Sequence, residues 1–483
     1  MGQSDPVQPL RLLVIGADAA GMSAAHQALR TARERGRDLE VVALEAGDHT
    51  SYSACGIPYW MAGDVGSASD LVARTVDQHR ERGVDLRMRH EAVALDLDAR
   101  TVEVRDHDAE RTFRLGFDEL VIATGAAPVL PPWAVDDGSG ALPRGVLPVK
   151  TLDDGAAWNR LLDERPERGL VVGGGYIGIE AAETFARRGV RTTLVTRGEH
   201  LLSTSLVPEM ADEVARGLRE AGVEVVTGAE VAAVAGSGGG GGGGSGGASA
   251  GAGQVRVACV DGRDFPADVV AIGIGVRPRV ELAVAAGLPI GGPRVQGALV
   301  PDDHQRVADG VWAAGDCCAV HDRLLGEPWF VPLGTHANKA GRVAGTNIGG
   351  GDVRFPGAVG TAILRAGAVE VSRTGLLPAW ADRIGLVTRS VRLESTTASG
   401  YMPESEPMSV WVLGEVGTGR LLGAQITGGR GAGKRIDVLA TALSTGLTAH
   451  DVAHLDLAYA PPFSSAWDPV QIACRNLAEV LEK

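Results

Sequence analysis

One cysteine stands alone in a stretch whose residue types could support redox chemistry. Residues 50–60 read TSYSACGIPYW, and none of the five residues after Cys55 is a second cysteine. A thiol at the start of an apolar helix favours the reactive thiolate, because a helix N-terminus stabilises negative charge. Without a nearby partner, this thiolate is expected to cycle through a mixed disulfide with a small thiol, or through a sulfenic acid. The alternative is an inert, buried cysteine.

A glycine turn near the N-terminus has the features of a dinucleotide site. The apolar run LRLLVIG leads into Gly16, Ala17 and Gly21, a pattern that lacks the middle glycine of GxGxxG, and the next strand ends at Glu45. Such glycines let a helix N-terminus approach a pyrophosphate, and an acid after the second strand accepts ribose hydroxyls. The alternative is a plain strand–helix–strand unit.

A second copy carries the complete glycine pattern. RGLVVGGGYIGIEAAETF contains Gly173, Gly175 and Gly178, and its second strand ends at Val195. Thr196 and Arg197 stand where an acid would hold the ribose of NAD, and an arginine suits a 2′-phosphate. The pattern therefore predicts NADPH as hydride donor. NADH is the alternative, if Arg197 is only an exposed loop charge.

Two further segments favour a flavin at the first site. LVIATGAAP ends a strand at Thr124-Gly125, and VWAAGDCCA ends a strand at Gly315-Asp316. The Asp316 carboxylate is placed to bind a ribityl hydroxyl, and the helix that follows can face phosphate. Two dinucleotide sites in one chain indicate a hydride donor and a flavin acceptor, so we expect NAD(P)H and FAD.

In this order the motifs resemble the pyridine nucleotide-disulfide oxidoreductases over nearly the whole chain. The segments that carry the resemblance are GADAAG, Glu45, Cys55-Gly-Ile-Pro, ATG, GGGYIGIE and AAGD. The resemblance implies an α/β fold with two Rossmann-like domains of the glutathione reductase type, which bind FAD and NAD(P), and a C-terminal α+β dimerisation domain. It implies that Tyr176 covers the flavin until nicotinamide enters, and that Glu180 orients the nicotinamide or anchors its helix.

The resemblance also implies domain bounds and a homodimer with a shared active site. The FAD domain is expected in two parts, 1–150 and 277–354, around an NAD(P) domain at 151–276, with the dimerisation domain at 355–483. The glycine-rich stretch 236–253 is expected to be a hairpin loop on the NAD(P) domain, because strand-like sequences flank it; an interdomain linker is the alternative.

Within the family, the chain is most similar to coenzyme A (CoA)-disulfide reductases, which have a single redox cysteine. SYSACGIPYW matches their cysteine segment, and Ala19 stands where lone-cysteine peroxidases and oxidases carry a histidine. Tyr401 and Tyr459 match two interface tyrosines that would donate a proton to the leaving thiolate from the opposite subunit. Ala54 departs from the asparagine often found before the cysteine. The implied CoA contacts are Ser23, Gln27, Arg30, Ser51, Arg82 and Asn338.

The sequence therefore predicts an FAD-dependent NAD(P)H enzyme that reduces a low-molecular-weight disulfide. CoA disulfide is the expected substrate, and CoA joined to Cys55 is the expected intermediate. Three alternatives remain: reduction of polysulfide or persulfide at the same cysteine, NAD(P)H oxidase or peroxidase chemistry through a sulfenic acid, and electron transfer to a protein such as a ferredoxin. In the last case Cys55 would be dispensable.

Composition argues against several other classes of protein. The 483 residues are 45% hydrophobic with a net charge of −14, which allows several cores but gives no basic footprint for nucleic acid. No apolar run is long enough for a bilayer and no signal peptide pattern precedes the first strand, so we expect a cytoplasmic location and no membrane. Cysteine and histidine spacings indicate no metal site.

Overall fold

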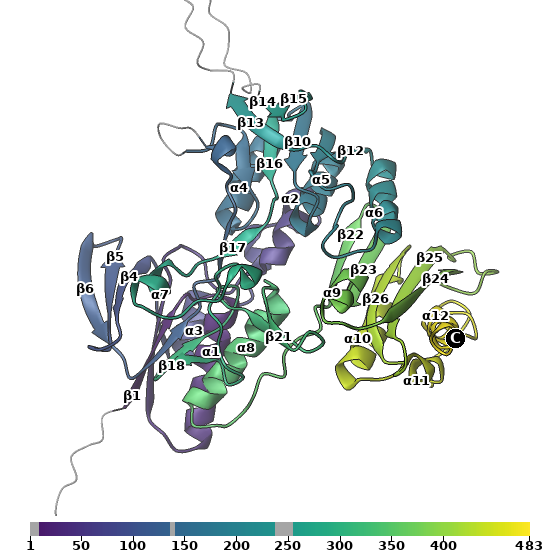
Figure 1. The fold of residues 1–483 in the computed structure, drawn as a ribbon. Helices are drawn as coiled ribbons and strands as arrows, with labels where there is room; N and C mark the ends of the chain where they lie inside the picture. The colour runs from purple at the N-terminus through teal and green to yellow at the C-terminus, as the bar shows by residue number, and fades with distance from the viewer. Residues whose placement is uncertain (1–8, 136–140, 237–254) are drawn as a thin grey trace, which may run out of the picture. The chain divides into compact units, whose positions relative to one another are not determined.

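The computed structural model describes residues 9–135, 141–236 and 255–483, and packing divides the chain into two compact units (Figure 1). Unit 1 comprises Met1–Gly56, Ser67–Ala127 and Val276–Ala358; unit 2 comprises Ile57–Gly66, Pro128–Gly275 and Val359–Lys483. The glycine-rich stretch lies outside the described residues, except for Gly236. The strands on its two sides, β13 (Val231–Gly236) and β14 (Val255–Cys259), pair antiparallel.

A six-stranded sheet forms the centre of unit 1, in the order β18-β19-β7-β1-β2-β3. Neighbouring strands are parallel, except that β18 and β19 are antiparallel. Its strands read as apolar runs such as LRLLVI because a parallel sheet is buried on both faces. The strands are β1 (Leu10–Ile15), β2 (Leu39–Leu44), β3 (Val84–Arg87), β7 (Glu119–Ile122), β18 (Arg306–Ala308) and β19 (Val311–Ala313).

Helices α1 (Ala19–Glu34) and α8 (Gly334–Ile348) of unit 1 lie along one another (Figure 1). Their spacing depends on glycine: a Cβ on Gly341 would lie 2.2 Å from the Ala20 carbonyl oxygen, and one on Gly345 would lie 2.2 Å from that of Ala24. Because the two backbones approach so closely, neighbouring side chains of α1 and α8 are also held close together.

Shorter elements complete unit 1. An antiparallel three-stranded sheet is formed by β4 (His90–Asp96), β5 (Thr101–Asp106) and β6 (Arg111–Gly116), and β20 (Val320–Asp322) pairs with β21 (Glu327–Trp329). The remaining elements are α3 (Val76–Glu81), α7 (Glu281–Ala285), and the short strands β8 (Ala126–Pro128) and β17 (Val276–Pro278).

Unit 2 contains a second parallel sheet, in the order β12-β11-β10-β16-β9. Its strands are β9 (Val146–Pro148), β10 (Arg168–Val172), β11 (Arg191–Val195), β12 (Val223–Val226) and β16 (Val269–Ile272). Its helices are α2 (Ile57–Ala62), α4 (Leu152–Asp163), α5 (Tyr176–Arg187) and α6 (Pro208–Glu220), and β15 (Asp264–Ala267) extends the β13–β14 pair.

The C-terminal part of unit 2 is a five-stranded antiparallel sheet with helices after it. Its order is β22-β23-β26-β25-β24, and β26 is buried along its whole length, which fits a central strand. The strands are β22 (Ala362–Ala366), β23 (Val369–Gly375), β24 (Thr388–Thr396), β25 (Pro407–Glu415) and β26 (Leu421–Gly428). The helices are α9 (Pro378–Arg383), α10 (Ile436–Thr445), α11 (Ala449–Ala453) and α12 (Pro469–Leu481). None of the described helices in either unit combines the length and apolar character needed to cross a bilayer.

Candidate active site

The two predicted nucleotide turns are built alike, although the first lacks the middle glycine. A Cβ on Gly21 would lie 1.9 Å from the Gly16 carbonyl oxygen, and a Cβ on Gly178 would lie 1.9 Å from that of Gly173. Gly16 and Gly173 both have positive φ, +98° and +120°, and each backs onto a neighbouring strand end so closely that no side chain fits. Each turn therefore forms the cradle that a pyrophosphate needs.

The N-termini of both nucleotide helices are open to a ligand. The N-cap residues are Asp18 for α1 and Gly175 for α5, and neither makes a side-chain capping bond. The first backbone amides of a helix need an outside partner, which a phosphate can supply. At the end of β2, Glu45 Oε2 accepts from the Ala17 amide at 3.0 Å, so its carboxylate faces the first turn as a ribose ligand must.

The other predicted flavin residues lie in unit 1 as well. Gly125 has φ +70° and accepts from the Arg279 amide through its carbonyl at 2.9 Å, while Thr124 Oγ1 donates to the Arg279 carbonyl at 2.6 Å. Gly315 and Asp316 line a cavity of about 540 Å³, a volume in the range of ligand pockets. The first glycine cradle fits the pyrophosphate of an FAD, and the Asp316 carboxylate fits a hydroxyl of its ribityl chain.

In the second turn, Tyr176 and Glu180 lie on the first turns of α5. Burial raises the pKa of Tyr176, and the nearby Arg373 and Ser205 oppose this shift with smaller effects. Burial, and then the nearby charge of Glu183, raise the pKa of Glu180 to about 7. Glu180 is therefore a partly buried acid that can hold or release a proton near neutral pH.

Arg197 lies exposed just after β11, at the place predicted for a 2′-phosphate contact. No carboxylate of the described residues forms an ion pair with it, although Glu199 is two positions away. Its guanidinium is therefore available to an anionic ligand.

Cys55 lies in the 3₁₀ turn Ala54–Gly56, and α2 begins at the following residue. It is exposed, whereas the other four cysteines are buried. Burial raises the pKa of Cys474 to about 12 and raises those of Cys259 and Cys318. Cys317 and Cys318 are in contact, with their sulfurs 3.6 Å apart. Cys55 is thus the accessible thiol of the chain.

The segment before Cys55 is held by backbone bonds to residues 71–73. The Ala73 amide donates to the Ser51 carbonyl at 2.8 Å, and the Ser53 amide donates to the Leu71 carbonyl at 2.8 Å. Ser51 has φ +48°, an uncommon conformation for a serine. The cysteine loop is therefore a fixed, locally strained piece of backbone.

A group of basic side chains lies beside this loop. Arg74, after the paired segment, interacts electrostatically with Arg82 at the C-cap of α3, and both interact with His26 and His79. Burial, and then Arg82, lower the pKa of Arg74. Within the described part of the chain, no carboxylate forms an ion pair with either arginine. The group is therefore cationic, and the residues that the structure describes supply no carboxylate as its counterion.

Two histidines in this group form a hydrogen-bonded chain with Ser51. His26 Nε2 lies 2.7 Å from His79 Nδ1, and His79 Nε2 lies 2.9 Å from Ser51 Oγ. His79 is fully buried, at 0% exposure. Burial, with smaller effects of neighbouring positive charges that include Arg74 and Arg82, lowers the pKa of each histidine to about 4. Both rings are therefore neutral at neutral pH.

The predicted substrate residues fall into two groups. Ser23 on α1 donates to Asn338 Oδ1 on α8 at 2.8 Å, which brings together two residues 315 positions apart. Gln27 donates to Thr31 on its own helix at 3.1 Å, and Arg30 is exposed on α1, one turn after His26. Ser51 and Arg82 belong to the basic group described above.

Tyr401 and Tyr459 lie on adjacent loops of the C-terminal part of unit 2. The Ser399 amide donates to the Pro461 carbonyl at 2.9 Å, and Ser399 Oγ donates to the Ser464 carbonyl at 3.0 Å. Four aromatic side chains on these loops are exposed: Tyr401 at 74%, Tyr459 at 50%, Phe463 at 73% and Trp467 at 54%. An aromatic surface of this kind is typical of an interface.

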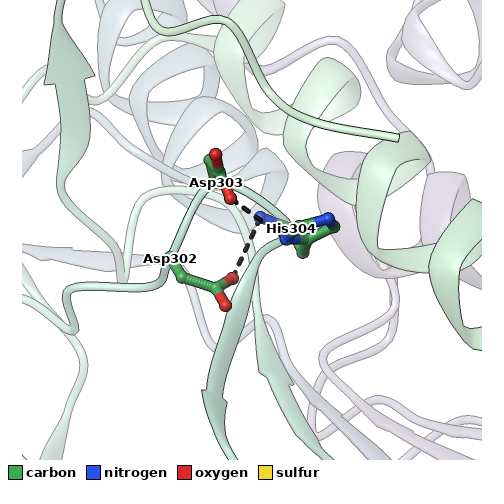
Figure 2. Close-up of side chains that lie close together, drawn as sticks. All are labelled: Asp302, Asp303 and His304. Atoms are coloured by element: carbon green, nitrogen blue, oxygen red, sulfur yellow. Dashed lines mark hydrogen bonds and ion pairs between the residues drawn. The ribbon is translucent and has the colours of Figure 1, made fainter. Parts of the chain in front are cut away.

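One group of possible metal ligands occurs in the described residues, Asp302, Asp303 and His304 (Figure 2). The His304 amide donates to Asp302, and its ring contacts Asp303 at 3.0 Å and Asp352 at 2.9 Å. Both ring nitrogens of His304 thus already contact a carboxylate, and we assign no metal to this group.

Sequence reasoning missed His26, His79 and Arg74 as members of the site. The sequence signal was weak, because His79 sits at a buried position of a short helix and His26 is one polar residue among several on α1. Arg74 follows the segment that pairs with the cysteine loop, but this pairing is not visible in the sequence.

Two family models match the chain. The model described as pyridine nucleotide-disulphide oxidoreductase matches residues 10–341, and the corresponding dimerisation domain matches residues 366–470. The chain is 32% identical to the NAD(P)H sulfur oxidoreductase (CoA-dependent) of Pyrococcus abyssi, over 96% of this chain and 98% of the relative. It is 30% identical to the NADH oxidase of Methanocaldococcus jannaschii, over 98% and 99%.

A more distant relative and a solved structure extend these matches. The coenzyme A disulfide reductase of Staphylococcus epidermidis is 22% identical, over 96% of this chain and 98% of the relative. The structure of an NAD-dependent persulfide reductase from A. fulgidus has a TM-score of 0.88 and 32% identity, and covers 98% of this chain and 84% of that one.

Proposed function

Because this chain belongs to the pyridine nucleotide-disulphide oxidoreductase family, we propose that it reduces a low-molecular-weight disulfide, with CoA disulfide as the substrate and NADPH as the preferred donor. FAD, held by the Gly16 turn, Glu45 and Asp316, would carry two electrons from the nicotinamide to the cysteine. The exposed Cys55 thiolate attacks one sulfur of the disulfide, which forms a Cys55–CoA mixed disulfide and releases the other half as a thiolate. Two electrons then break the mixed disulfide, which releases the second half as a thiolate and restores the Cys55 thiolate.

The observation that carries this substrate is the pair of arginines beside the cysteine loop. We call Arg74 and Arg82 the arginine face. Arg74 and Arg82 repel one another, and no carboxylate among the described residues pairs with either. Guanidinium groups bind phosphates through charge-assisted, bidentate hydrogen bonds. CoA carries phosphates on the arm that leads to its sulfur. Oxygen and hydrogen peroxide carry no phosphate that the arginine face could bind.

Comparison of CoA disulfide with pantethine tests this proposal, because pantethine has the same disulfide without the phosphates. We expect the unmutated enzyme to prefer CoA disulfide, and Arg74→Ala with Arg82→Ala to remove most of that preference. A charge-assisted contact is worth roughly 1.5–3 kcal/mol, so each arginine should change kcat/KM by about tenfold or more. Arg114→Ala, on β6 of the same unit, is the matched control. Equal use of both disulfides by the unmutated enzyme would refute the assignment of CoA disulfide.

Reduction of a persulfide or polysulfide at Cys55 is the second candidate. Two of the matches at 32% identity favour it, because one is named a CoA-dependent NAD(P)H sulfur oxidoreductase and the other an NAD-dependent persulfide reductase. A CoA persulfide would use the same arginine face. Faster NADPH oxidation with polysulfide plus CoA than with CoA disulfide would favour this candidate.

The exposed aromatic loops support a homodimer, since the chain contains a dimerisation domain. We propose that a second copy of the chain covers Tyr401 and Tyr459. In this arrangement each phenol serves the cysteine of the partner and donates a hydrogen bond to the leaving thiolate.

A further inference from the structure

Ser51, His79 and His26 form a continuous chain of polar groups from the cysteine loop to the surface of α1. The ring centroids of His26 and His79 are 5.0 Å apart and the ring planes differ by 23°. The nitrogens between them are only 2.7 Å apart. The two imidazoles therefore meet edge to edge and in line, as a direct N–H···N hydrogen bond requires, and not face to face.

This geometry allows protons to move without a charged intermediate. A neutral imidazole has one N–H and one lone pair, so each ring can accept a proton on one side while it gives one up on the other. Arg74 and Arg82 face the pair from the loop and from α3, and favour the neutral rings. His79 is fully buried, whereas His26 and Ser51 at the two ends are partly exposed.

The proposed reaction needs such a route for a proton. Reduction of one disulfide to two thiols takes two electrons and two protons. A hydride from NADPH brings two electrons and one proton, so the second proton must come from solvent. When substrate and a second subunit cover the cysteine, bulk water reaches the sulfur less freely.

We propose that His26, His79 and Ser51 relay this solvent proton to the thiolate that leaves when Cys55 attacks the disulfide. The inference rests on the proposed function. A proton enters at His26, each ring passes on the proton it already holds, and the Ser51 hydroxyl gives its own proton to the CoA sulfur while it receives one from His79. Ser51 and Cys55 belong to one fixed loop, and four residues span at most roughly 14 Å. The Cα atoms of Ser51 and Cys55 are therefore at most roughly 14 Å apart, and the proposed relay places the sulfur that leaves next to the Ser51 hydroxyl.

The test uses variants that separate proton transfer from packing. In His79→Gln, the amide can still hydrogen-bond to both neighbours but cannot exchange tautomers. His79→Ala leaves a space for added imidazole. His26→Gln breaks the relay at its more exposed end and is a second variant should His79 variants fold poorly. His90→Gln is the matched control, since His90 is a part-buried histidine of unit 1 bonded to the Met88 carbonyl. Flavin content and reduction of ferricyanide by NADPH confirm an intact enzyme.

We expect His79→Gln and His26→Gln to lower kcat for CoA disulfide by about tenfold or more, in line with the loss of a proton donor, with little change in KM. Imidazole should restore kcat in His79→Ala but not in His79→Gln. Unchanged kcat in a folded His79→Gln or His26→Gln enzyme, or no imidazole effect on a folded His79→Ala, would overturn the relay alone. Absence of CoA disulfide turnover in the unmutated enzyme would instead refute the proposed function, and the relay with it.

Discussion

Arg365 on β22 binds the carboxylate of Glu183 on α5 through two nitrogens, at 2.9 and 3.1 Å. Glu180 lies one turn earlier on the same helix and has no such cation among the described residues. This difference explains why the pKa of Glu180 is raised to about 7 by its own burial and by the neighbouring charge of Glu183. The helix thus carries one paired carboxylate and one acid that titrates near neutrality.

Glu180 should make the stability of the protein fall as pH rises. Between pH 4.5, the ordinary pKa of the side chain, and about 7, the folded protein holds a proton that the unfolded chain has lost. Relative to Glu180→Gln, the unmutated protein should therefore lose on the order of 2–3 kcal/mol of stability between pH 4 and 8. Denaturant unfolding at both pH values measures this, with the exposed Glu199→Gln as control. Parallel pH profiles for the unmutated protein and Glu180→Gln would contradict it.

Gly16→Ala should prevent flavin binding, because the new Cβ would lie 2.2 Å from the Ala123 carbonyl oxygen. Gly36→Ala is the matched control, since Gly36 also has positive φ but nothing lies within 4 Å of its Cβ position. The control should cost only about 1–2 kcal/mol and keep its flavin. Flavin absorbance per chain and thermal unfolding check both variants. A Gly16→Ala protein with full flavin content would show that this turn is not the cradle.

Arg197→Ala should lower kcat/KM for NADPH about tenfold or more and leave NADH nearly unchanged, because a charge-assisted phosphate contact is worth roughly 1.5–3 kcal/mol. Arg191→Ala, at the exposed start of β11, is the control. Equal efficiency of the unmutated enzyme with both nucleotides would show that Arg197 does not select the donor.

Subunits with complementary lesions should restore activity. Chains with Cys55→Ser and chains with Tyr401→Phe and Tyr459→Phe are mixed under conditions that exchange subunits. In a mixed dimer one site receives all the lesions and the other none, so about half of the activity per dimer should return, by two-fold symmetry. No recovery after proven exchange would mean that each chain builds its own site, or that the tyrosines do not serve the chemistry.

The family, the fold class and the assignment as an oxidoreductase were predictable from the sequence and are confirmed by the family matches and by the similar structure. The reason is physical. No side chain fits at four positions of the two turns, so these positions require glycine and the pattern can be recognised in the sequence: Gly16, Gly21, Gly173 and Gly178. The roles of the individual site residues stay predictions, and so do the bounds of the four segments that make up the three domains.

The basic group beside Cys55 was not predictable in the same way. His26 and His79 are 53 positions apart, and their contact depends on how α1 and α3 meet. Neither residue belongs to a periodic or glycine-marked pattern. The resemblance indicated Ser23 and Asn338 as substrate contacts, but their direct hydrogen bond follows from the close approach of α1 and α8 that Gly341 and Gly345 permit.

The central claim is that Cys55 forms a mixed disulfide with CoA, and intact mass tests it most directly. The purified protein is incubated with CoA disulfide, and its mass is measured before and after NADPH is added. Cys55 is the exposed cysteine and the other four are buried, so one CoA should add to the Cys55 peptide and leave again with NADPH. The Cys55→Ser protein should keep its FAD, gain no CoA and reduce no disulfide. Continued turnover of CoA disulfide by Cys55→Ser, or an unmutated enzyme that turns over without any adduct, would contradict the account.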